Sequence, residues 1–429
     1  MNGPWNDTDT WAVESGWPGS GDTAYIGGIL TVQLATFSTD CAKLFMDGGT
    51  VDIGSGSLLR TTEELNMSGG GLSGAGTLLN DGIFTRSGTA DHMINCTVTN
   101  TGTVNHQDAG GLTVGGAFNN AAAAEYYLHG DGGINGGGIF RNFGLLAKTG
   151  GTGTSAASTT FHNAGGTLAV SSGRLRLTGS GTFQSGTYFA DEDGVLEFAG
   201  NSVLTGTLQG TGTGEVRWTA GTWGSGTDAT LAISNFCWRG GELNGHVAND
   251  GRFSLDASAT GTVKHATLDN RALVRHSSGT LRLLAESGGT STVNNEDGAA
   301  WEIVTNGVFL SGGTGWGNTW FNNFGCLAKT GGDGISRLDL DTSAGLAYGG
   351  FCNFGGAIEV RSGRLELAAE GVYSNGIYTA AAGAVLHLGG GIDNLGRMTF
   401  DAANATNTVW HGGLKNSGLL RQTGGILRI

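Results

Sequence analysis

The sequence predicts an all-β protein, a single-stranded parallel β-solenoid of about 20 coils with about 21 residues in each coil. Three observations predict it. Glycine provides 83 of the 429 residues and proline only 2. A short Asn-x-Gly motif returns at near multiples of one period, and short alternating strands take the place of long amphipathic helical patterns. Units this small cannot bury an inner face alone, so they must stack at ~4.8 Å per coil, which predicts a rod on the order of 100 Å long.

The unit Asn-x-Gly-x-hydrophobic sets the period. Asparagine tolerates corner conformations, and its amide can bond to an amide one coil above or below. Glycine supplies positive φ at corners without a Cβ clash. We therefore predict a ladder of structural Asn side chains. The full copies of the unit begin at Asn80, Asn100, Asn142, Asn163, Asn249, Asn323, Asn353, Asn394 and Asn416, and a degenerate copy begins at Asn270.

A second motif, Ser-Gly-x-Leu-x-Leu, supports the same period. It begins at Ser172, Ser278 and Ser362, and its alternation places the Leu side chains on one face and the charged side chains on the other. Residues 140–151 also match residues 321–332, which indicates a duplication.

This pattern divides the chain into a cap-like segment at residues 1–28 and a continuous solenoid at 29–429. The solenoid contains two related arms at about 80–200 and 249–390. Trp5, Trp11 and Trp17 depart from the repeat and are suited to cover the first coil. The sequence stops in the middle of a repeat, so we expect that the natural protein continues or that this end meets another subunit.

The composition excludes several classes of protein. With 38% hydrophobic and 14% charged residues the chain is too apolar for disorder. The net charge of −14 is spread thinly without a basic stripe, so nucleic acid is not an expected partner. The sequence contains no run of 18 apolar residues, so membrane insertion is not expected, and the first twenty residues lack a signal-peptide pattern. The five widely separated Cys residues are expected to be buried single thiols.

The N-terminal sequence carries a resemblance. Trp5-Asn-Asp-Thr-Asp-Thr-Trp11, followed by Trp17-Pro-Gly-Ser-Gly-Asp-Thr-Ala-Tyr-Ile26, resembles the opening of secreted bacterial parallel β-helix repeat proteins. These include autotransporter passenger-like domains and large surface adhesins. The Phe-x-Asn-x-Gly-x-Leu-x-Lys-Thr-Gly-Gly block at 140–151 and 321–332 is similar to their repeats. The resemblance implies a secreted or cell-surface protein and carries over no catalytic residues.

Two sets of residues are candidates for chemistry. Parallel β-helix enzymes that act on polysaccharides use paired carboxylates, and the candidates here are Asp191, Asp193, Asp339 and Asp341. A solvated surface is the favoured interpretation for them. Exposed aromatic side chains can stack on sugar rings or partner proteins, and the candidates are Trp218, Trp223, Trp316 and Trp320, although core filling is favoured. The common hydrolase and nucleotide motifs are missing, and no cofactor or metal ion is expected.

The expected function is that of an extracellular structural or adhesive rod without catalytic activity, such as a surface stalk, an adhesin or a filament subunit. Its expected partners are copies of itself, stacked end to end, or glycans and proteins of a cell surface. The alternative is a parallel β-helix protein that binds or cleaves polysaccharides. The fold alone does not decide between them, since one scaffold hosts both classes.

Overall fold

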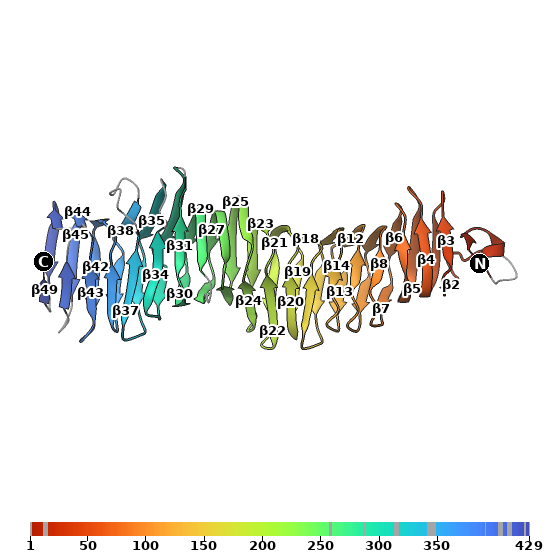
Figure 1. Cartoon of the computed structure of the whole chain (residues 1–429), viewed down its shortest axis with the longest axis horizontal. Coiled ribbons are helices and arrows are strands. Elements are labelled where there is room, and N and C mark those ends of the chain that lie inside the picture. Colours follow the sequence, from red (N-terminus) through yellow and green to blue (C-terminus); the bar gives the residue numbers. More distant parts are fainter. Residues whose placement is uncertain are drawn as a thin grey trace. The chain divides into compact units, whose positions relative to one another are not determined.

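The computed structural model is an all-β parallel solenoid of about 18 turns, with 64% of residues in strands and almost no helix (Figure 1). It describes residues 2–11, 16–256, 260–286, 288–312, 317–340, 349–390, 392–401, 406–409, 414–423 and 426–428. The predicted fold class is thereby confirmed. The chain divides into two compact units. Unit 1 contains Met1–Ser202 and Leu208–Val216, and unit 2 contains Val203–Thr207 and Arg217–Ile429.

The regular coils of unit 1 contain three short strands each. One coil holds β6 (Thr77–Asn80), β7 (Ile83–Arg86) and β8 (His92–Ile94). The next holds β9 (Thr97–Asn100), β10 (Thr103–His106) and β11 (Leu112–Val114). Each strand pairs in parallel with its equivalent one coil away, β6 with β9, β7 with β10 and β8 with β11. The same order continues through β12 (Ala117–Asn120), β13 (Glu125–Leu128), β14 (Ile134–Asn135), β15 (Ile139–Asn142), β16 (Leu145–Lys148), β17 (Thr154–Ala157), β18 (Thr160–Ala164), β19 (Thr167–Val170) and β20 (Gly173–Leu177).

The first coils of unit 1 already include strands from the N-terminal segment. Strand β1 (Gly3–Pro4) pairs with β3 (Thr31–Leu34), and β2 (Thr23–Ile26) pairs with the long strand β4 (Thr39–Ile53). Strand β4 in turn pairs with β5 (Leu58–Ser73). Trp5 is fully buried, and its Nε1 atom donates to the carbonyl oxygen of Pro18 at 3.0 Å. Residues 1–28 therefore contribute both sheet strands and a buried ring.

Unit 2 repeats this arrangement with less regular spacing. One column runs through β25 (Thr222–Ile233), β27 (Gly241–Asn249), β29 (Gly261–Asn270), β32 (Thr290–Asn295), β35 (Asn318–Asn323) and β38 (Gly349–Phe354), each paired in parallel with the next. The step from Asn295 to Asn323 spans 28 residues and the step from Asn323 to Asn353 spans 30. Coils of this length explain why about 18 turns form where a uniform period of about 21 residues predicts about 20.

The core follows the alternation seen in the sequence. Inward side chains of successive coils stack on their equivalents, as in the column Phe118, Phe140 and Phe161, whose ring centroids lie 5.1 and 5.3 Å apart. The inward Leu residues of all three Ser-Gly-x-Leu-x-Leu motifs are buried. Four of the five cysteines are buried and Cys326 is half-buried, all as free thiols. Among the described residues, no helix is long and apolar enough to span a membrane.

Glycine serves two different purposes in the coils. In the three Ser-Gly motifs, Gly173, Gly279 and Gly363 have φ of 64°, 73° and 61°, the left-handed region that glycine adopts without strain. In the Asn-x-Gly motifs, Gly165 and Gly355 also have positive φ, 76° and 89°, as expected, whereas Gly82 and Gly102 are required for a different reason. A Cβ atom on Gly82 or Gly102 would collide with a backbone carbonyl oxygen of the preceding coil. Close backbone approach between coils therefore requires glycine at these two positions.

Candidate functional site

A buried chain of amide hydrogen bonds runs through unit 1 at the ends of β6, β9, β12, β15 and β18. The Nδ2 atom of each Asn donates to the Oδ1 atom of the Asn one coil further on, at 2.7–2.9 Å. The side chains are Asn80, Asn100, Asn120, Asn142 and Asn163, all 0% exposed. Each coil is therefore bonded to the next by side chains as well as by the backbone.

The same amides explain the Asn-x-Gly spacing. Asn80 Nδ2 also donates to the carbonyl oxygen of Gly82 at 3.1 Å, and Asn100 Nδ2 donates to that of Gly102 at 3.0 Å. The side chain thus holds its own turn and the adjacent coil together. Asn120 does not match the Asn-x-Gly motif, because Ala occupies both of the next two positions, and it was therefore not predicted. Its separation from Asn100, which is one coil, is the signal that identifies it.

Unit 2 contains a second amide chain of the same design. Donor–acceptor distances of 2.7–2.8 Å link Asn249, Asn270, Asn295, Asn323 and Asn353 in that order. Asn295 was not expected from the motif, whereas the degenerate copy at Asn270 is a full member. Near the C-terminal end, Asn394 Nδ2 donates to the exposed Asn416 at 2.6 Å.

Both chains end on a buried tyrosine. Asn163 Nδ2 donates to the hydroxyl of Tyr188 at 2.8 Å, and Asn353 Nδ2 donates to that of Tyr378 at 2.8 Å. Burial raises the pKa of both tyrosines well above the ordinary value, so both remain neutral hydroxyls. The hydroxyl oxygen accepts the last amide proton of each chain, so the terminal Asn of each chain has a buried acceptor for its amide.

The duplicated Lys-Thr-Gly-Gly block holds a buried ammonium group in each unit. Lys148 Nζ bonds to Gly150 O at 2.8 Å, Asp131 Oδ1 at 2.9 Å and Ser155 Oγ at 3.2 Å. Its counterpart in unit 2 is Lys329, which is also 0% exposed and bonds to Gly331 O and Ser336 Oγ in the same way. These contacts join neighbouring coils, so the repeated block is explained by structure.

In unit 2, Asn306 takes the position of the carboxylate. Its Oδ1 atom lies 3.2 Å from Lys329 Nζ. Burial lowers the pKa of Lys329, and the charge of Asp333 offsets only part of that effect.

The carboxylates proposed for catalysis are surface groups where the structure describes them. Asp191 and Asp193 are exposed in the turn between β21 (Gly181–Ala190) and β22 (Gly194–Phe198). Asp339 ends β37 (Ile335–Asp339), and its Oδ1 atom lies 3.4 Å from Arg337 Nη2, with both side chains nearly half exposed. Asp341 lies outside the described residues. Among the described residues, the carboxylate of Asp339 is thus paired with the guanidinium of Arg337.

The tryptophans proposed as binding platforms need a correction. Trp218 and Trp223 are each 1% exposed, and their ring centroids lie 4.3 Å apart at an angle of 7°. A ring without solvent exposure cannot receive a sugar, so the platform interpretation is wrong for these two residues and core filling holds. Trp320 is half-buried on β35, and Trp316 lies outside the described residues.

One cluster of ionisable side chains was missed by the sequence analysis. His246 on β27 lies between two carboxylates, with Nδ1 2.8 Å from Asp228 Oδ1 and Nε2 2.7 Å from Asp269 Oδ2. Partial burial alone would lower the pKa of His246, but the two carboxylates outweigh it and raise the pKa. The separations of 18 and 23 residues, close to one coil each, are the signal that brings these residues together.

The geometry of this cluster indicates that it links neighbouring coils to one another. Both ring nitrogens of His246 are occupied by Asp oxygens, so neither is free to act as a base toward a substrate. Three successive coils each contribute one side chain. Within the described parts of the chain, no group of three or more His, Cys, Asp or Glu side chains is placed to hold a metal ion.

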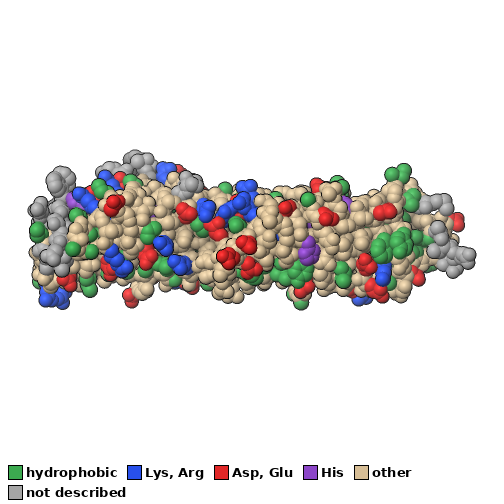
Figure 2. Space-filling view, turned by 90° about the horizontal axis from the view of Figure 1, so that it is seen from below, with side chains coloured by type: hydrophobic (Ala, Val, Ile, Leu, Met, Phe, Trp, Pro, Cys, Tyr) green, Lys and Arg blue, Asp and Glu red, His purple; other side chains and the backbone are tan. Residues whose placement is uncertain are grey.

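The surface itself is mixed in charge. Figure 2 shows Lys and Arg side chains interspersed with Asp and Glu side chains on the face that it presents, with no continuous basic stripe. Comparisons of the chain with family models, with curated proteins and with solved structures found no match.

Proposed function

We propose that the chain is an extracellular structural or adhesive β-solenoid without catalytic activity, such as a surface stalk, an adhesin or a filament subunit. The observation that carries the proposal is the pair of buried amide chains, in which polar side chains are used to bond one coil to the next. In a repeat protein, stability comes from such nearest-neighbour interfaces. A scaffold built in this way is suited to hold surface groups at fixed spacing.

The ionisable side chains support the absence of catalysis. Asp339 is paired with Arg337, Asp191 and Asp193 are solvated, and His246 has both nitrogens occupied. A site for glycoside hydrolysis would need two carboxyl groups at a fixed separation, one of them with a raised pKa. Asp339 and His246 are instead engaged with charged side chains of the same chain, which supports the proposal of a structural role.

The proposed location rests on the sequence. The N-terminal tryptophan pattern from Trp5 to Ile26 and the duplicated block resemble secreted bacterial β-helix repeats, and a parallel solenoid is the fold that such repeats form. We therefore propose that the protein acts at a bacterial cell surface, with surface glycans, surface proteins or further copies of the chain as partners.

A cleavage assay tests the non-catalytic part of the proposal. The chain is incubated with neutral polysaccharides and with polyuronates, and new reducing ends and unsaturated uronates are measured. We expect no product with any substrate. Product formation that is lost in Asp339→Ala or Asp191→Ala, in variants with unchanged circular dichroism, would contradict it and support the polysaccharide-cleaving alternative.

Electron microscopy of the chain across a concentration series separates the structural roles. Filaments that lengthen with concentration would identify a filament subunit, and single particles at all concentrations would identify a stalk or an adhesin. Binding of the single particles to cells, lost after the glycans are stripped from the cell surface, would then establish the adhesive role.

A further inference from the structure

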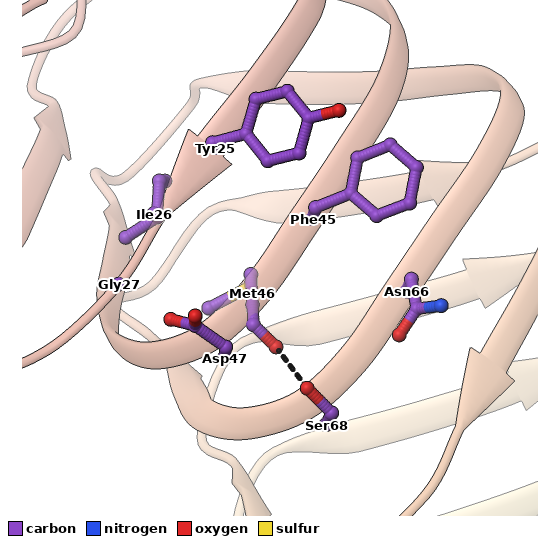
Figure 3. A pocket seen from close by; sticks show the side chains of 8 residues that line it. All are labelled: Tyr25, Ile26, Gly27, Phe45, Met46, Asp47, Asn66 and Ser68. Atoms are coloured by element: carbon purple, nitrogen blue, oxygen red, sulfur yellow. Dashed lines mark hydrogen bonds between the residues drawn. The ribbon is translucent and has the colours of Figure 1, made fainter.

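Two aromatic rings lie side by side on the outer face of the first coils of unit 1. Tyr25 on β2 is directly opposite Phe45 on β4 in the parallel ladder. Their ring centroids are 5.0 Å apart and their planes differ by 12°. In Figure 3 both ring faces are turned to the same side. The two rings together therefore form a flat aromatic surface.

This surface is exposed to solvent. Tyr25 is 72% exposed, although most aromatic side chains of the described chain lie in the core. Figure 2 shows hydrophobic side chains gathered near the N-terminal end of the chain. An outward pair of rings on a strand adds little to folding, because the rings remain hydrated, and such exposed apolar groups commonly mark a binding site.

Polar side chains border the rings. Asp47 follows Phe45 by two residues on β4, next to an irregularity in the pairing with β5, and Asn66 on β5 is directly opposite Phe45. Ser68 follows on β5, where its hydroxyl donates to the carbonyl oxygen of Met46 at 3.4 Å. Together these residues and the rings line a pocket of about 430 Å³ (Figure 3). That volume falls within the range of roughly 300–1,000 Å³ that is typical of small-molecule sites.

The polar groups are available to a ligand. Within the described chain, the Asp47 carboxylate, the Asn66 amide and the Tyr25 hydroxyl form no hydrogen bond or ion pair. Gly27 leaves room for the carboxylate, since a Cβ atom there would lie 2.5 Å from Asp47 Oδ1. The site thus offers a carboxylate with two acceptor oxygens, an amide that can both donate and accept, and one hydroxyl beside a flat apolar surface.

We propose that this pocket binds one pyranose unit of a neutral glycan, with an apolar face of the sugar ring on Tyr25 and Phe45 and its hydroxyl groups bonded to Asp47 and Asn66. A pyranose combines a face of C–H groups with an edge of hydroxyls, which matches this combination of surfaces. The inference rests on the adhesive role proposed above and names its ligand class.

Charge selects against other ligands. Asp47 lines the pocket, and Glu63 and Glu64 lie nearby, where Lys43 Nζ approaches them at 3.9 and 4.0 Å. This surplus of carboxylates repels phosphates and uronates. A quaternary ammonium ligand is best held by rings that enclose it, whereas these two rings form one flat surface.

The test is titration of the full chain with neutral cello-, manno-, xylo- and malto-oligosaccharides, followed by calorimetry and by ligand-observed NMR. The variants are Tyr25→Ala and Asp47→Ala. The matched control is Phe143→Ala, which removes another exposed aromatic ring, 42% exposed, away from the pocket. We expect binding of at least one series, weakened tenfold or more in both pocket variants and unchanged in the control.

Several outcomes would overturn the proposal: no binding of any neutral series, binding that survives in Tyr25→Ala, or preferential binding of oligouronates or choline. Circular dichroism and hydrogen exchange of β2 and β4 show whether each variant is folded, and Tyr25→Phe, which keeps the ring, should retain most of the affinity. Absence of sugar binding by the unaltered chain overturns only this site, whereas sugar cleavage overturns the non-catalytic function proposed above.

Discussion

Replacement of one buried amide should destabilise the solenoid far more than replacement of its outward neighbour. Asn120 on β12 accepts from Asn100 Nδ2 at 2.9 Å and donates to Asn142 Oδ1 at 2.8 Å and to the carbonyl oxygen of Leu145 at 2.9 Å. Asn120→Ala removes these three bonds and leaves the Oδ1 atom of Asn142 without the donor from Asn120. At about 1 kcal/mol for each bond and about 1–3 kcal/mol for a buried orphan, the expected loss of unfolding free energy is about 4–6 kcal/mol.

The matched control is the adjacent residue on the same strand. Asn119 points outward, and its Oδ1 atom accepts a single surface bond from Arg141 Nη1 at 3.3 Å. Asn119→Ala should therefore change the free energy of unfolding by less than about 0.5 kcal/mol.

Denaturant unfolding and hydrogen exchange measure the difference together, because a repeat protein can open locally without unfolding completely. We expect faster exchange in β9, β12 and β15 for Asn120→Ala, together with a lower denaturation midpoint. Equal midpoints and equal exchange for Asn120→Ala and Asn119→Ala would refute the assignment of the amide chain as a main contributor to coil stacking.

Three further predictions follow from close approach and from titration. Gly138→Ala should destabilise the chain because its Cβ atom would collide with the backbone of the preceding coil. A Cβ atom at Gly137 would meet open space, so Gly137→Ala is the matched control. Equal thermal melting temperatures for the two variants would contradict this prediction. Burial lowers the pKa of His106 to about 4, so the unfolded chain binds more protons below pH 6.5 and stability falls as the pH drops toward 4. Protonation of His106 alone should lower the free energy of unfolding by about 2 kcal/mol between pH 7 and pH 5. Denaturant unfolding curves of His106→Gln should lack that part of the pH dependence. NMR titration of His246 should give a pKa above 6.5, and this pKa should fall in Asp269→Asn. The protonated His246, paired with the carboxylates, stabilises the folded chain at low pH, and this stabilisation is lost as the pH rises through the pKa of the folded state. An unchanged pKa in Asp269→Asn would rule out the pairing.

Periodicity was a reliable guide to the fold. The spacing of Asn80, Asn100 and Asn142 indicated stacked coils, and alternation in the Ser-Gly-x-Leu-x-Leu motifs indicated which face is buried. Both patterns are local and repeat many times along the chain, so an irregular spacing at one coil does not change the predicted fold. The coil count was less accurate, because long turns in unit 2 do not change the strand pattern.

Sites on the outer face were harder to predict. A binding or charged cluster on a solenoid joins residues one coil apart, so its sequence separation equals the local coil length. His246, Asp228 and Asp269 are such a case, and so are Tyr25, Phe45 and Asn66. Short motifs with fixed spacing do not describe these sites, since each turn varies in length.

The sequence alone determined that this chain forms a parallel solenoid with an Asn ladder, because backbone pairing, inward apolar side chains and Asn-x-Gly turns are dictated by each repeat and its immediate neighbours. Only the tertiary structure decided which aromatic rings are available. Trp218 and Trp223 are buried whereas Tyr25 is exposed, although composition and hydrophobicity suggest no such difference. The physical reason is register: a shift of one residue along a strand moves a side chain from the core to the solvent, and that register is fixed by pairing with the neighbouring coils.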